Sequence, residues 1–357
     1  MPRHADASPK QSSQTARHAV PEYAPPRHGV LSYLPASWVP YGELTRIDKP
    51  AGFILIYFPH LFGSLYAAAV VAGAEGGSTN AVTPLHIIRQ NLILFLGSVL
   101  SRSAICCWND VIDREYDRQV LRCRLRPIAR RAISPFQGLL LTAALTMLSL
   151  ACLFSLPRNC WVISVPDILL MALYPFTKRF LNFPQAVLGA QVSLAFFLGG
   201  FAIDDNFIVI SEMQQKGVAD LLNDHGIWAM ISFYLANVCW TIVYDTVYAQ
   251  QDVEDDAKAG IRSMAVHFKG QVKALISAVS AVQVALLFGS GHWQGFGGLY
   301  TAFACVGTGS SLIYMIATTD LNDPRHCAWF FRTGQWLVNF SITGGLAAEW
   351  LGLSWMS

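Results

Sequence analysis

Charged residues are scarce in this chain. Lysine, arginine, aspartate and glutamate make up 13% of its 357 residues, whereas a soluble domain usually carries about 25%. Hydrophobic residues account for 53%, so too few polar side chains remain to cover a soluble core of this size. The composition excludes an ordinary soluble domain and indicates lipid as the solvent. The net charge of +2 gives no sign of a nucleic-acid partner, and we predict none.

Familiar metal and redox motifs of cysteine are also missing. The eight cysteines include no CxxC pair, and no Cys/His spacing suggests zinc. Most of them lie in apolar runs, where a thiol packs as a small hydrophobic group. The Gly-centred acidic loop of a calcium site is missing as well.

The first 40 residues lack the apolar core of a secretory signal and contain repeated prolines. We predict a disordered polar N-terminal tail over residues 1–40 and a membrane domain over residues 41–357. A mitochondrial presequence is the alternative interpretation of the tail.

Nine apolar runs of membrane-spanning length follow the tail. They predict an all-α, polytopic membrane protein with nine transmembrane helices. The expected spans are 52–73, 88–108, 138–156, 160–176, 184–203, 227–249, 271–290, 297–318 and 330–350.

The basic residues between these runs support the predicted topology. Seventeen lysines and arginines fall on one side of the membrane and three on the other. Basic loops stay on the cytosolic or matrix side, so the long loop over residues 109–137 belongs there. An endomembrane of the ER type is the favoured location, and the mitochondrial inner membrane is the alternative.

Two acidic clusters occur on the basic side, each at the end of a span. The first contains Asn109, Asp110, Asp113 and Asp117, and at about 100° per residue these side chains share one helix face. The second contains Asp245, Asp252 and Asp256, which form one stripe in the same way. Either cluster alone could be a solvated helix end at the membrane surface.

Carboxylates crowded on one helix face repel one another, so two such stripes on one side require a positive partner. Hard oxygen ligands on two helices suit Mg²⁺, which binds carboxylates together with phosphate oxygens and water. Arg122, Arg126 and Lys178 lie on the same side, and a metal with arginine and lysine is the usual means of neutralising a diphosphate. For Arg124 and Arg131 we favour a role in membrane orientation.

The clusters belong to longer patterns. Asn109-Asp110-x-x-Asp113-x-x-x-Asp117 resembles the first signature of the UbiA-type membrane prenyltransferases. The second cluster resembles their second signature in the form found in 4-hydroxybenzoate polyprenyltransferases. Further matches are Arg46-x-Asp48-Lys49-Pro50-x-Gly52, Arg126-Pro127-Ile128-Ala129, Tyr174-Pro175-x-x-Lys178-Arg179 and Tyr244-Asp245-Thr246-x-Tyr248-Ala249-x-Gln251-Asp252-x-x-Asp255-Asp256.

The resemblance implies nine helices around a central cavity, with both acidic motifs at its cytosolic mouth. It implies that Lys178 contacts phosphate and that Arg46 orients the donor or the acceptor. It also implies that Mg²⁺ and the diphosphate are held by six oxygen-bearing side chains: Asn109, Asp113, Asp117, Asp245, Asp252 and Asp256. We predict Asp113, Asp117, Asp245 and Asp252 as the catalytic carboxylates, and Asp245 is also a candidate for removing the ring proton.

The expected activity is Mg²⁺-dependent transfer of a prenyl group, with farnesyl diphosphate as the favoured donor, to a phenolic aromatic acid. Arg130-Arg131 stands where the quinone-pathway enzymes typically have Ser-Gly, and the stretch from Asp117 to Pro127 is closer to fungal enzymes that farnesylate polyketide-derived phenols for meroterpenoids. The alternative within the family is a 4-hydroxybenzoate polyprenyltransferase of ubiquinone biosynthesis. A membrane cation transporter is a more distant alternative, although transporters place their acidic residues nearer mid-membrane.

Overall fold

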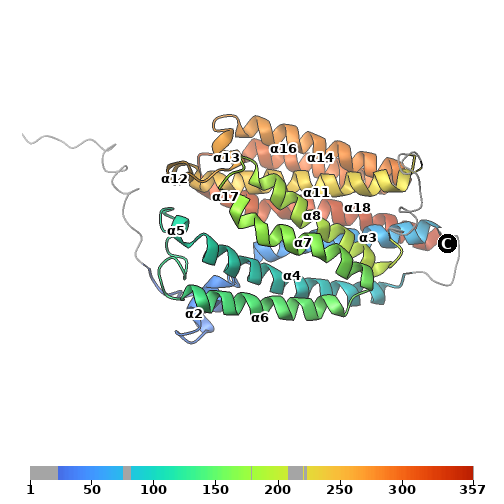
Figure 1. Cartoon of the computed structure of the whole chain (residues 1–357). Coiled ribbons are helices and arrows are strands. Elements are labelled where there is room, and N and C mark those ends of the chain that lie inside the picture. The colour runs from blue at the N-terminus through green and yellow to red at the C-terminus, as the bar shows by residue number, and fades with distance from the viewer. Residues whose placement is uncertain (1–22, 75–81, 178, 208–219, 221–222, 357) are drawn as a thin grey trace, which may run out of the picture.

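The computed structural model describes residues 23–74, 82–177, 179–207, 220 and 223–356, and the account below concerns these residues. They form a bundle of long helices that run roughly side by side (Figure 1). No strand occurs in the described ranges. The long helices are α3 (Pro50–Ala74), α4 (Pro84–Ile112), α6 (Pro135–Phe154), α7 (Arg158–Thr177), α8 (Pro184–Ile203), α11 (His225–Ala249), α14 (Val272–Gln294), α16 (Thr308–Thr318) and α18 (Gln335–Met356).

Short helical segments complete the chain. α15 (Gly298–Tyr300) and the π-helical Thr301–Gly307 run into α16, and α17 (Pro324–Trp329) and the π-helical Phe330–Gly334 run into α18. The others are the 3₁₀ segments Val30–Tyr33 and Gln250–Asp252, α2 (Val39–Leu44), α5 (Arg114–Asp117), α12 (Val253–Lys258) and α13 (Met264–His267).

Eight helical segments in the described chain are long and apolar enough to cross a membrane. They coincide with the first eight predicted spans, and α18 runs beside them where the ninth was expected. The predicted all-α membrane fold is therefore confirmed. The boundary near Pro157 also holds, because α6 and α7 are separate helices.

Local sequence explains where several helices begin. Proline occupies the first helical position of α4, α6 and α8, where its missing N–H costs no hydrogen bond. The Thr83 side chain accepts a hydrogen bond from the backbone N–H of His86 at the start of α4. Ser134 and Gln137 form a reciprocal capping box at the start of α6.

Helices α3 and α8 approach each other closely at two glycines. A Cβ atom added to Gly63 would lie 1.8 Å from the carbonyl oxygen of Phe196, and one added to Gly199 would lie 2.0 Å from that of His60. Only glycine fits at these two crossing points, as in other tightly packed membrane helices.

An aromatic cluster fills the end of the bundle that carries the C-terminus. Tyr66 packs edge-on against Phe196 and Phe233, whose rings stack at 4.8 Å between centroids. The Tyr66 hydroxyl donates to Gln294 at 3.1 Å. Aromatic side chains are therefore densely packed around Tyr66 at this end.

Part of the predicted N-terminal tail contacts the bundle. Residues 1–22 of the tail lie outside the described residues, whereas residues 23–40 are described. The Tyr23 hydroxyl donates to Glu43 at 3.1 Å, and the Arg130 guanidinium lies 3.9 Å from the centre of the Tyr23 ring. The division into a tail over residues 1–40 and a membrane domain over residues 41–357 stays a prediction.

Candidate active site

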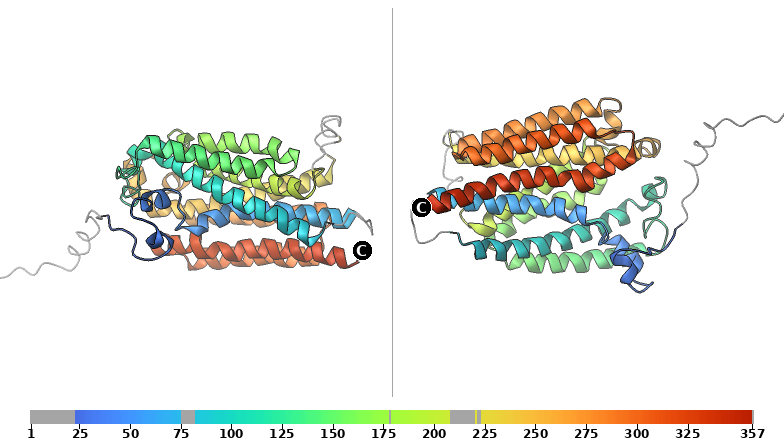
Figure 2. Two further views of the ribbon diagram at one scale, coloured as in Figure 1. Left: turned by 90° about the horizontal axis from the view of Figure 1, so that it is seen from below. Right: turned by 180° about the vertical axis from the view of Figure 1, so that it is seen from behind.

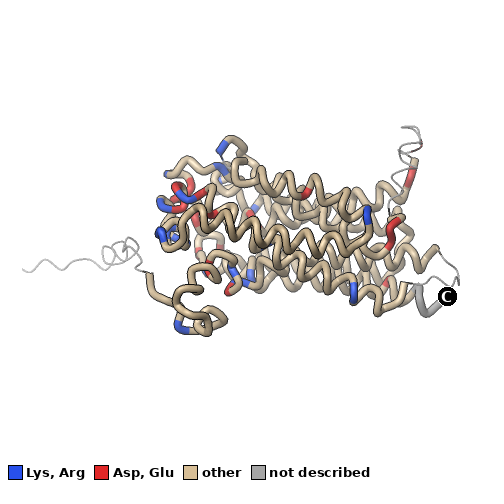
Figure 3. The backbone as a smooth tube through the Cα atoms, turned by 60° about the horizontal axis from the view of Figure 1, so that its bottom comes forward, with Lys and Arg blue, Asp and Glu red and all other residues tan. Residues whose placement is uncertain are grey.

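Lysine and arginine gather at one end of the bundle, together with many of the acidic residues (Figure 3). This is the end where the short helices α2, α5, α12 and α13 lie (Figure 1), and Figure 2 shows the same grouping from two further sides. The asymmetry agrees with the topology predicted from the loops.

The first acidic cluster spans a break in the helix. α4 ends at Ile112, Asp113 stands outside regular helical geometry, and α5 begins at Arg114. The backbone N–H of Asp113 nevertheless donates to Asn109 and that of Asp117 to Asp113, both at 2.8 Å. Helical spacing is kept across the break, so Asp113 and Asp117 line the same cavity.

Asp110 lies beside them but does not line the cavity. It is 1% exposed, and Arg46 Nη2 donates to its two carboxylate oxygens at 2.8 and 2.9 Å. Arg126 Nη1 lies 3.3 Å from Asp110 and 2.9 Å from Asp117, so these two carboxylates share one cation.

The second cluster faces the first across this cavity. α11 continues through a 3₁₀ turn, Gln250–Asp252, into α12. Asp245, Asp252 and Asp256 all line the cavity, which encloses about 220 Å³. We call it the mouth cavity. It brings together the two acidic stripes that lie more than a hundred residues apart in the sequence.

Two arginines neutralise carboxylates in the mouth cavity. Arg122 Nε donates to both oxygens of Asp252 at 2.9 Å, Nη2 forms an ion pair with the same carboxylate, and Nη1 donates to the Tyr248 hydroxyl at 2.8 Å. Arg126 Nη1 donates to both oxygens of Asp117 at 2.9 Å and lies 3.3 Å from Asp110. The lining of this cavity therefore contains both carboxylates and the guanidinium groups that neutralise them.

Arg46, another predicted cation, is placed differently from Arg122 and Arg126. Arg46 is not among the lining residues, and besides Asp110 it donates to the Glu43 carbonyl at 2.8 Å. Its φ of 60° lies in the left-handed region, a strain that the buried ion pair helps to hold. Lys178 lies outside the described residues.

Burial shifts the pKa of two groups at this end. Loss of hydration raises the pKa of Asp117 to about 6, against the lowering effect of Arg126. Burial also lowers the pKa of Lys49, and the nearby charge of Arg46 lowers it further.

The side chains fit a hard cation that arrives with its own oxygen ligands. Within the described ranges, no three His, Cys, Asp or Glu side chains stand close enough to cage a metal on their own. The Asn109 Oδ1 atom is buried without a hydrogen-bond partner, which is costly unless a ligand completes it. Mg²⁺ needs only a few carboxylates when phosphate and water supply the rest, so this donor set suits Mg²⁺ bound to a diphosphate.

A second cavity of about 180 Å³, the inner cavity, lies below the mouth and shares Tyr174 and Asp245 with it. Its other lining is mainly apolar and aromatic, apart from Asn109, Gln191 and Arg102. Arg102 is a site residue that the sequence analysis left out. An arginine inside a span is itself a signal of function. In the described structure Arg102 bonds to the Cys106 sulfur and forms no ion pair with a carboxylate.

The fold and the two cavities define a polytopic membrane protein with a charged, oxygen-rich mouth above an apolar chamber. The family model of the UbiA prenyltransferase family matches residues 54–341. The chain belongs to this family, and the resemblance predicted from its motifs is confirmed. It is an enzyme, a prenyltransferase, which decides against a cation transporter.

Curated relatives cover most of the chain. The prenyltransferase ascA of Acremonium egyptiacum is 34% identical over 88% of both chains. The DMOA farnesyltransferase nvfB of Aspergillus novofumigatus is 33% identical over 91% of this chain and 95% of its own. The 4-hydroxybenzoate octaprenyltransferase of Azoarcus sp. is 37% identical over 87% of this chain and 96% of its own.

Solved structures share the fold at low identity. A UbiA homolog from Aeropyrum pernix K1 has a TM-score of 0.57 and 20% identity, covering 82% of this chain and 97% of its own. A UbiA homolog from Archaeoglobus fulgidus, described as bound to GPP and Mg²⁺, has a TM-score of 0.52 and 17% identity, covering 84% and 99%.

Proposed function

We propose that the protein transfers a farnesyl group from its diphosphate to a phenolic aromatic acid in the presence of Mg²⁺. One observation carries this proposal. The mouth cavity, which contains two facing acidic stripes and arginines, adjoins the largely apolar inner cavity. Arg102 lines the inner cavity and forms no ion pair with a carboxylate in the described structure. A diphosphate and its metal fit the first cavity, and a prenyl carbon with an anionic aromatic ring fits the second.

The donor's diphosphate would lie among the mouth residues. The proposed holders of Mg²⁺ are Asp113, Asp117, Asp245, Asp252 and Asp256 of the mouth cavity, together with Asn109, which lines the adjoining inner cavity. A bound Mg²⁺ would stabilise the negative charge that develops as the C–O bond breaks. Arg122 and Arg126 line the same cavity and can donate to diphosphate oxygens, and we extend this role to Lys178 from the family motif. The homolog described with GPP and Mg²⁺ supports this arrangement.

The inner cavity suits the reacting carbon. Departure of the diphosphate leaves an allylic cation, which water would quench, and an apolar chamber excludes water. Tyr174, Tyr244 and Phe331 contribute aromatic side chains to its lining. The negative face of an aromatic ring can stabilise such a cation.

Arg102 is the proposed partner of the acceptor's carboxylate. Its Nε lies close to Gly52, where an added Cβ would be 3.0 Å away, so the guanidinium is packed against α3 within the bundle. A guanidinium at membrane depth without a carboxylate is costly. An aromatic acid in the inner cavity would supply the missing anion.

The fungal relative that is named a farnesyltransferase favours a farnesyl donor. The Arg130-Arg131 pair, which departs from the quinone-pathway pattern, points the same way. In the structure Arg130 forms an ion pair with Glu43 at 2.6 Å, so it helps to fix α2 at the mouth. We also propose an ER-type endomembrane as the location of the enzyme, with the mitochondrial inner membrane as the alternative.

The rival activity is that of a 4-hydroxybenzoate polyprenyltransferase with a longer prenyl chain. It is favoured by the relative from Azoarcus, whose identity to this chain is as high as that of the fungal enzymes. Both activities would bind the diphosphate and Mg²⁺ in the mouth cavity in the same way. They differ in the length of the prenyl chain and in the aromatic ring that the inner cavity accepts.

The test is an assay of the purified protein with geranyl, farnesyl and longer diphosphates against 4-hydroxybenzoate and orsellinate. We expect prenylated acid and free diphosphate, loss of both products with EDTA, and recovery with added Mg²⁺. Asp252→Asn should be inactive, whereas the matched control Glu254→Gln, an exposed neighbour that does not line the cavity, should keep wild-type activity. Transfer that persists in EDTA, or in Asp252→Asn, would refute the metal-dependent mechanism.

A further inference from the structure

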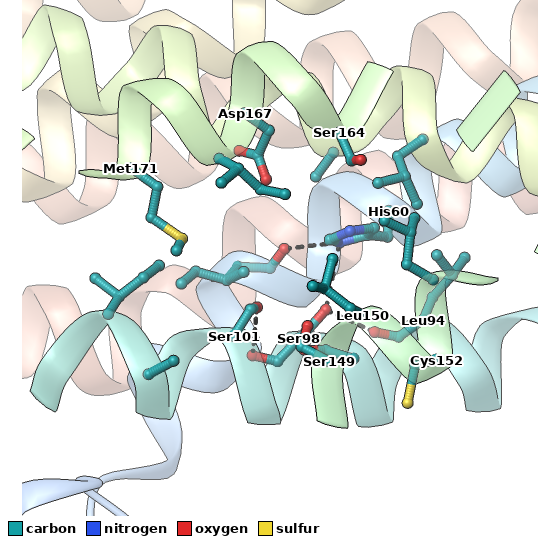
Figure 4. Close-up of a pocket in the computed structure, with 18 of the residues that line it drawn as sticks. His60, Leu94, Ser98, Ser101, Ser149, Leu150, Cys152, Ser164, Asp167 and Met171 are labelled. Carbon is teal, nitrogen blue, oxygen red and sulfur yellow. Dashed lines mark hydrogen bonds between the residues drawn. The ribbon is translucent and has the colours of Figure 1, made fainter. Parts of the chain in front are cut away.

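A third cavity, the deep cavity, lies among α3, α4, α6, α7 and α8 and encloses about 100 Å³. Figure 4 shows Asp167 and His60 directed into it, with Ser98 and Ser101 on the wall formed by α4. It shares Ile56, Ile105, Met171, Gln191 and Val192 with the inner cavity. These shared residues form the wall between the two chambers.

Asp167 is an unusual residue for this depth. It lies ten residues before the end of α7, or about 15 Å along the helix axis. A carboxyl group inside a span is costly and generally has a function. Its hydrogen-bond partner is Gln191 of α8, whose Nε2 donates to Asp167 Oδ1 at 2.5 Å.

This bond decides how the Gln191 amide is oriented. An amide has a donating nitrogen end and an accepting oxygen end, and a carboxylate oxygen selects the nitrogen. Gln191 is buried, and within the described structure its Oε1 accepts no hydrogen bond from the protein. Gln191 lines the inner cavity, whereas Asp167 lines only the deep cavity. The accepting end therefore has no protein donor within the described structure, on a side chain that lines both the inner and the deep cavity.

We propose that Asp167 and Gln191 form a positioning pair that recognises the phenolic hydroxyl of the aromatic acceptor. Gln191 Oε1 accepts the hydrogen bond from the phenol, and Asp167 holds and polarises the amide from behind. This inference rests on the proposed function. It goes beyond it by assigning specificity for a free hydroxyl group to two residues inside the spans.

The pair shares the inner cavity with Arg102. Arg102 lies on α4 and Gln191 on α8, so the two side chains line one cavity from different helices. An acid bound to Arg102 through its carboxylate can place a ring hydroxyl at Gln191.

The hydrogen bond would strengthen during the reaction. A ring carbon forms its bond to the prenyl carbon while the C–O bond breaks and its electron pair leaves with the diphosphate. The ring then carries a positive charge that its hydroxyl oxygen shares, so the O–H becomes a stronger donor until the ring proton is lost to the departing anion. An acceptor that is already oriented stabilises this transition state more than the ground state.

The experiment compares each acid with its phenol methyl ether, 4-hydroxybenzoate with 4-methoxybenzoate and orsellinate with its 4-O-methyl ether. The methoxy group also activates the ring but cannot donate a hydrogen bond from position 4. We expect wild-type kcat/KM to favour the free phenol. Gln191→Met should lower kcat/KM for the phenol about ten- to a hundredfold, leave the ether within about threefold, and leave the KM of the prenyl diphosphate unchanged.

Asp167→Asn should also lower the preference for the free phenol, but by less than Gln191→Met does. The Gln191 amide stays in place in this variant and loses only the carboxylate that polarises it. Gln191→Asn should fall between wild type and Gln191→Met. Ser164→Ala is the matched control, since Ser164 lines the deep cavity but bonds only to the Trp161 carbonyl at 2.7 Å. Its phenol preference should equal that of wild type.

A binding measurement without donor separates this inference from the proposed function. Wild type should bind 4-hydroxybenzoate more tightly than 4-methoxybenzoate, and Gln191→Met should bind the two equally. Equal loss of both acceptors in Gln191→Met, or an unchanged preference, would overturn the positioning role while prenyl transfer by wild type still supports the function. If wild type neither transfers to nor binds any phenolic acid, both proposals fail.

Discussion

Arg122 offers the sharpest test of the proposed diphosphate site in the mouth cavity. Its removal should change the affinities for Mg²⁺ and for the prenyl diphosphate in opposite directions. Its guanidinium holds Asp252 through Nε at 2.9 Å to both oxygens, so Mg²⁺ must compete with it for that carboxylate. The same guanidinium is 38% exposed and faces the cavity where the diphosphate is proposed to lie. We expect Arg122→Gln to strengthen binding of Mg²⁺ alone and to weaken binding of the prenyl diphosphate.

The magnitudes follow from the exposure of the pair. A partly exposed ion pair contributes about 1 kcal/mol or less, so Mg²⁺ affinity should rise no more than roughly fivefold. A charge-assisted hydrogen bond to a phosphate contributes about 1.5–3 kcal/mol, so the KM of farnesyl diphosphate should rise about ten- to a hundredfold.

Calorimetric titration of the purified protein with Mg²⁺ and initial-rate assays at saturating Mg²⁺ measure the two effects. Arg118→Gln is the matched control, since Arg118 forms its ion pair with exposed Glu115 and does not line the mouth cavity. If Arg122→Gln weakens the binding of both Mg²⁺ and the prenyl diphosphate, or of neither, then Arg122 does not release Asp252 to the metal and bind the diphosphate instead.

Three further outcomes can be checked together. Asp113→Ala should lose at least about a hundredfold in turnover while still inserting into membranes, as judged by detergent-extracted yield. Arg46→Met should leave buried Asp110 without its closest cation and lower the unfolding free energy by about 3–5 kcal/mol, measured as a lower thermal midpoint, and an unchanged midpoint would contradict the ion-pair role. Activity should fall as pH drops through about 6, because Asp117, whose pKa is raised to about 6, must be ionised to bind metal, and more Mg²⁺ should move that limb to lower pH. The free energy of unfolding should change in the opposite direction. Because the pKa of Asp117 is raised in the folded state, its ionised form lowers the stability at neutral pH, and the stability should increase as the pH falls below about 6.

The sequence predicted the architecture well because lipid imposes a simple rule. A span must be about 20 apolar residues long, so the predicted span 184–203 matches α8 at both ends. Helical spacing also placed Asp113, Asp117, Asp245, Asp252 and Asp256 correctly enough for all five to line one cavity. Their roles as ligands stay predictions.

Partner choice could not be derived in the same way. Spacing put Asp110 near Asp117, and Arg126 contacts both, but the closer salt bridge from Arg46, which lies between α2 and α3, could not be derived from spacing. Gln191 and Asp167 are 24 residues apart on neighbouring helices, and nothing in either helix shows that their side chains meet. Arg102 had a signal, a charge inside a span, but its neighbours depend on how α3, α4, α7 and α8 converge.

The guanidinium at Arg102 has a consequence for the order of biosynthetic steps. An ester, an amide or a decarboxylated phenol would leave that charge unmatched in the interior, so such molecules should be poor acceptors. Prenylation would then have to precede any enzyme that esterifies or removes the acid group. The enzyme would then accept only rings whose carboxylic acid group has not yet been modified.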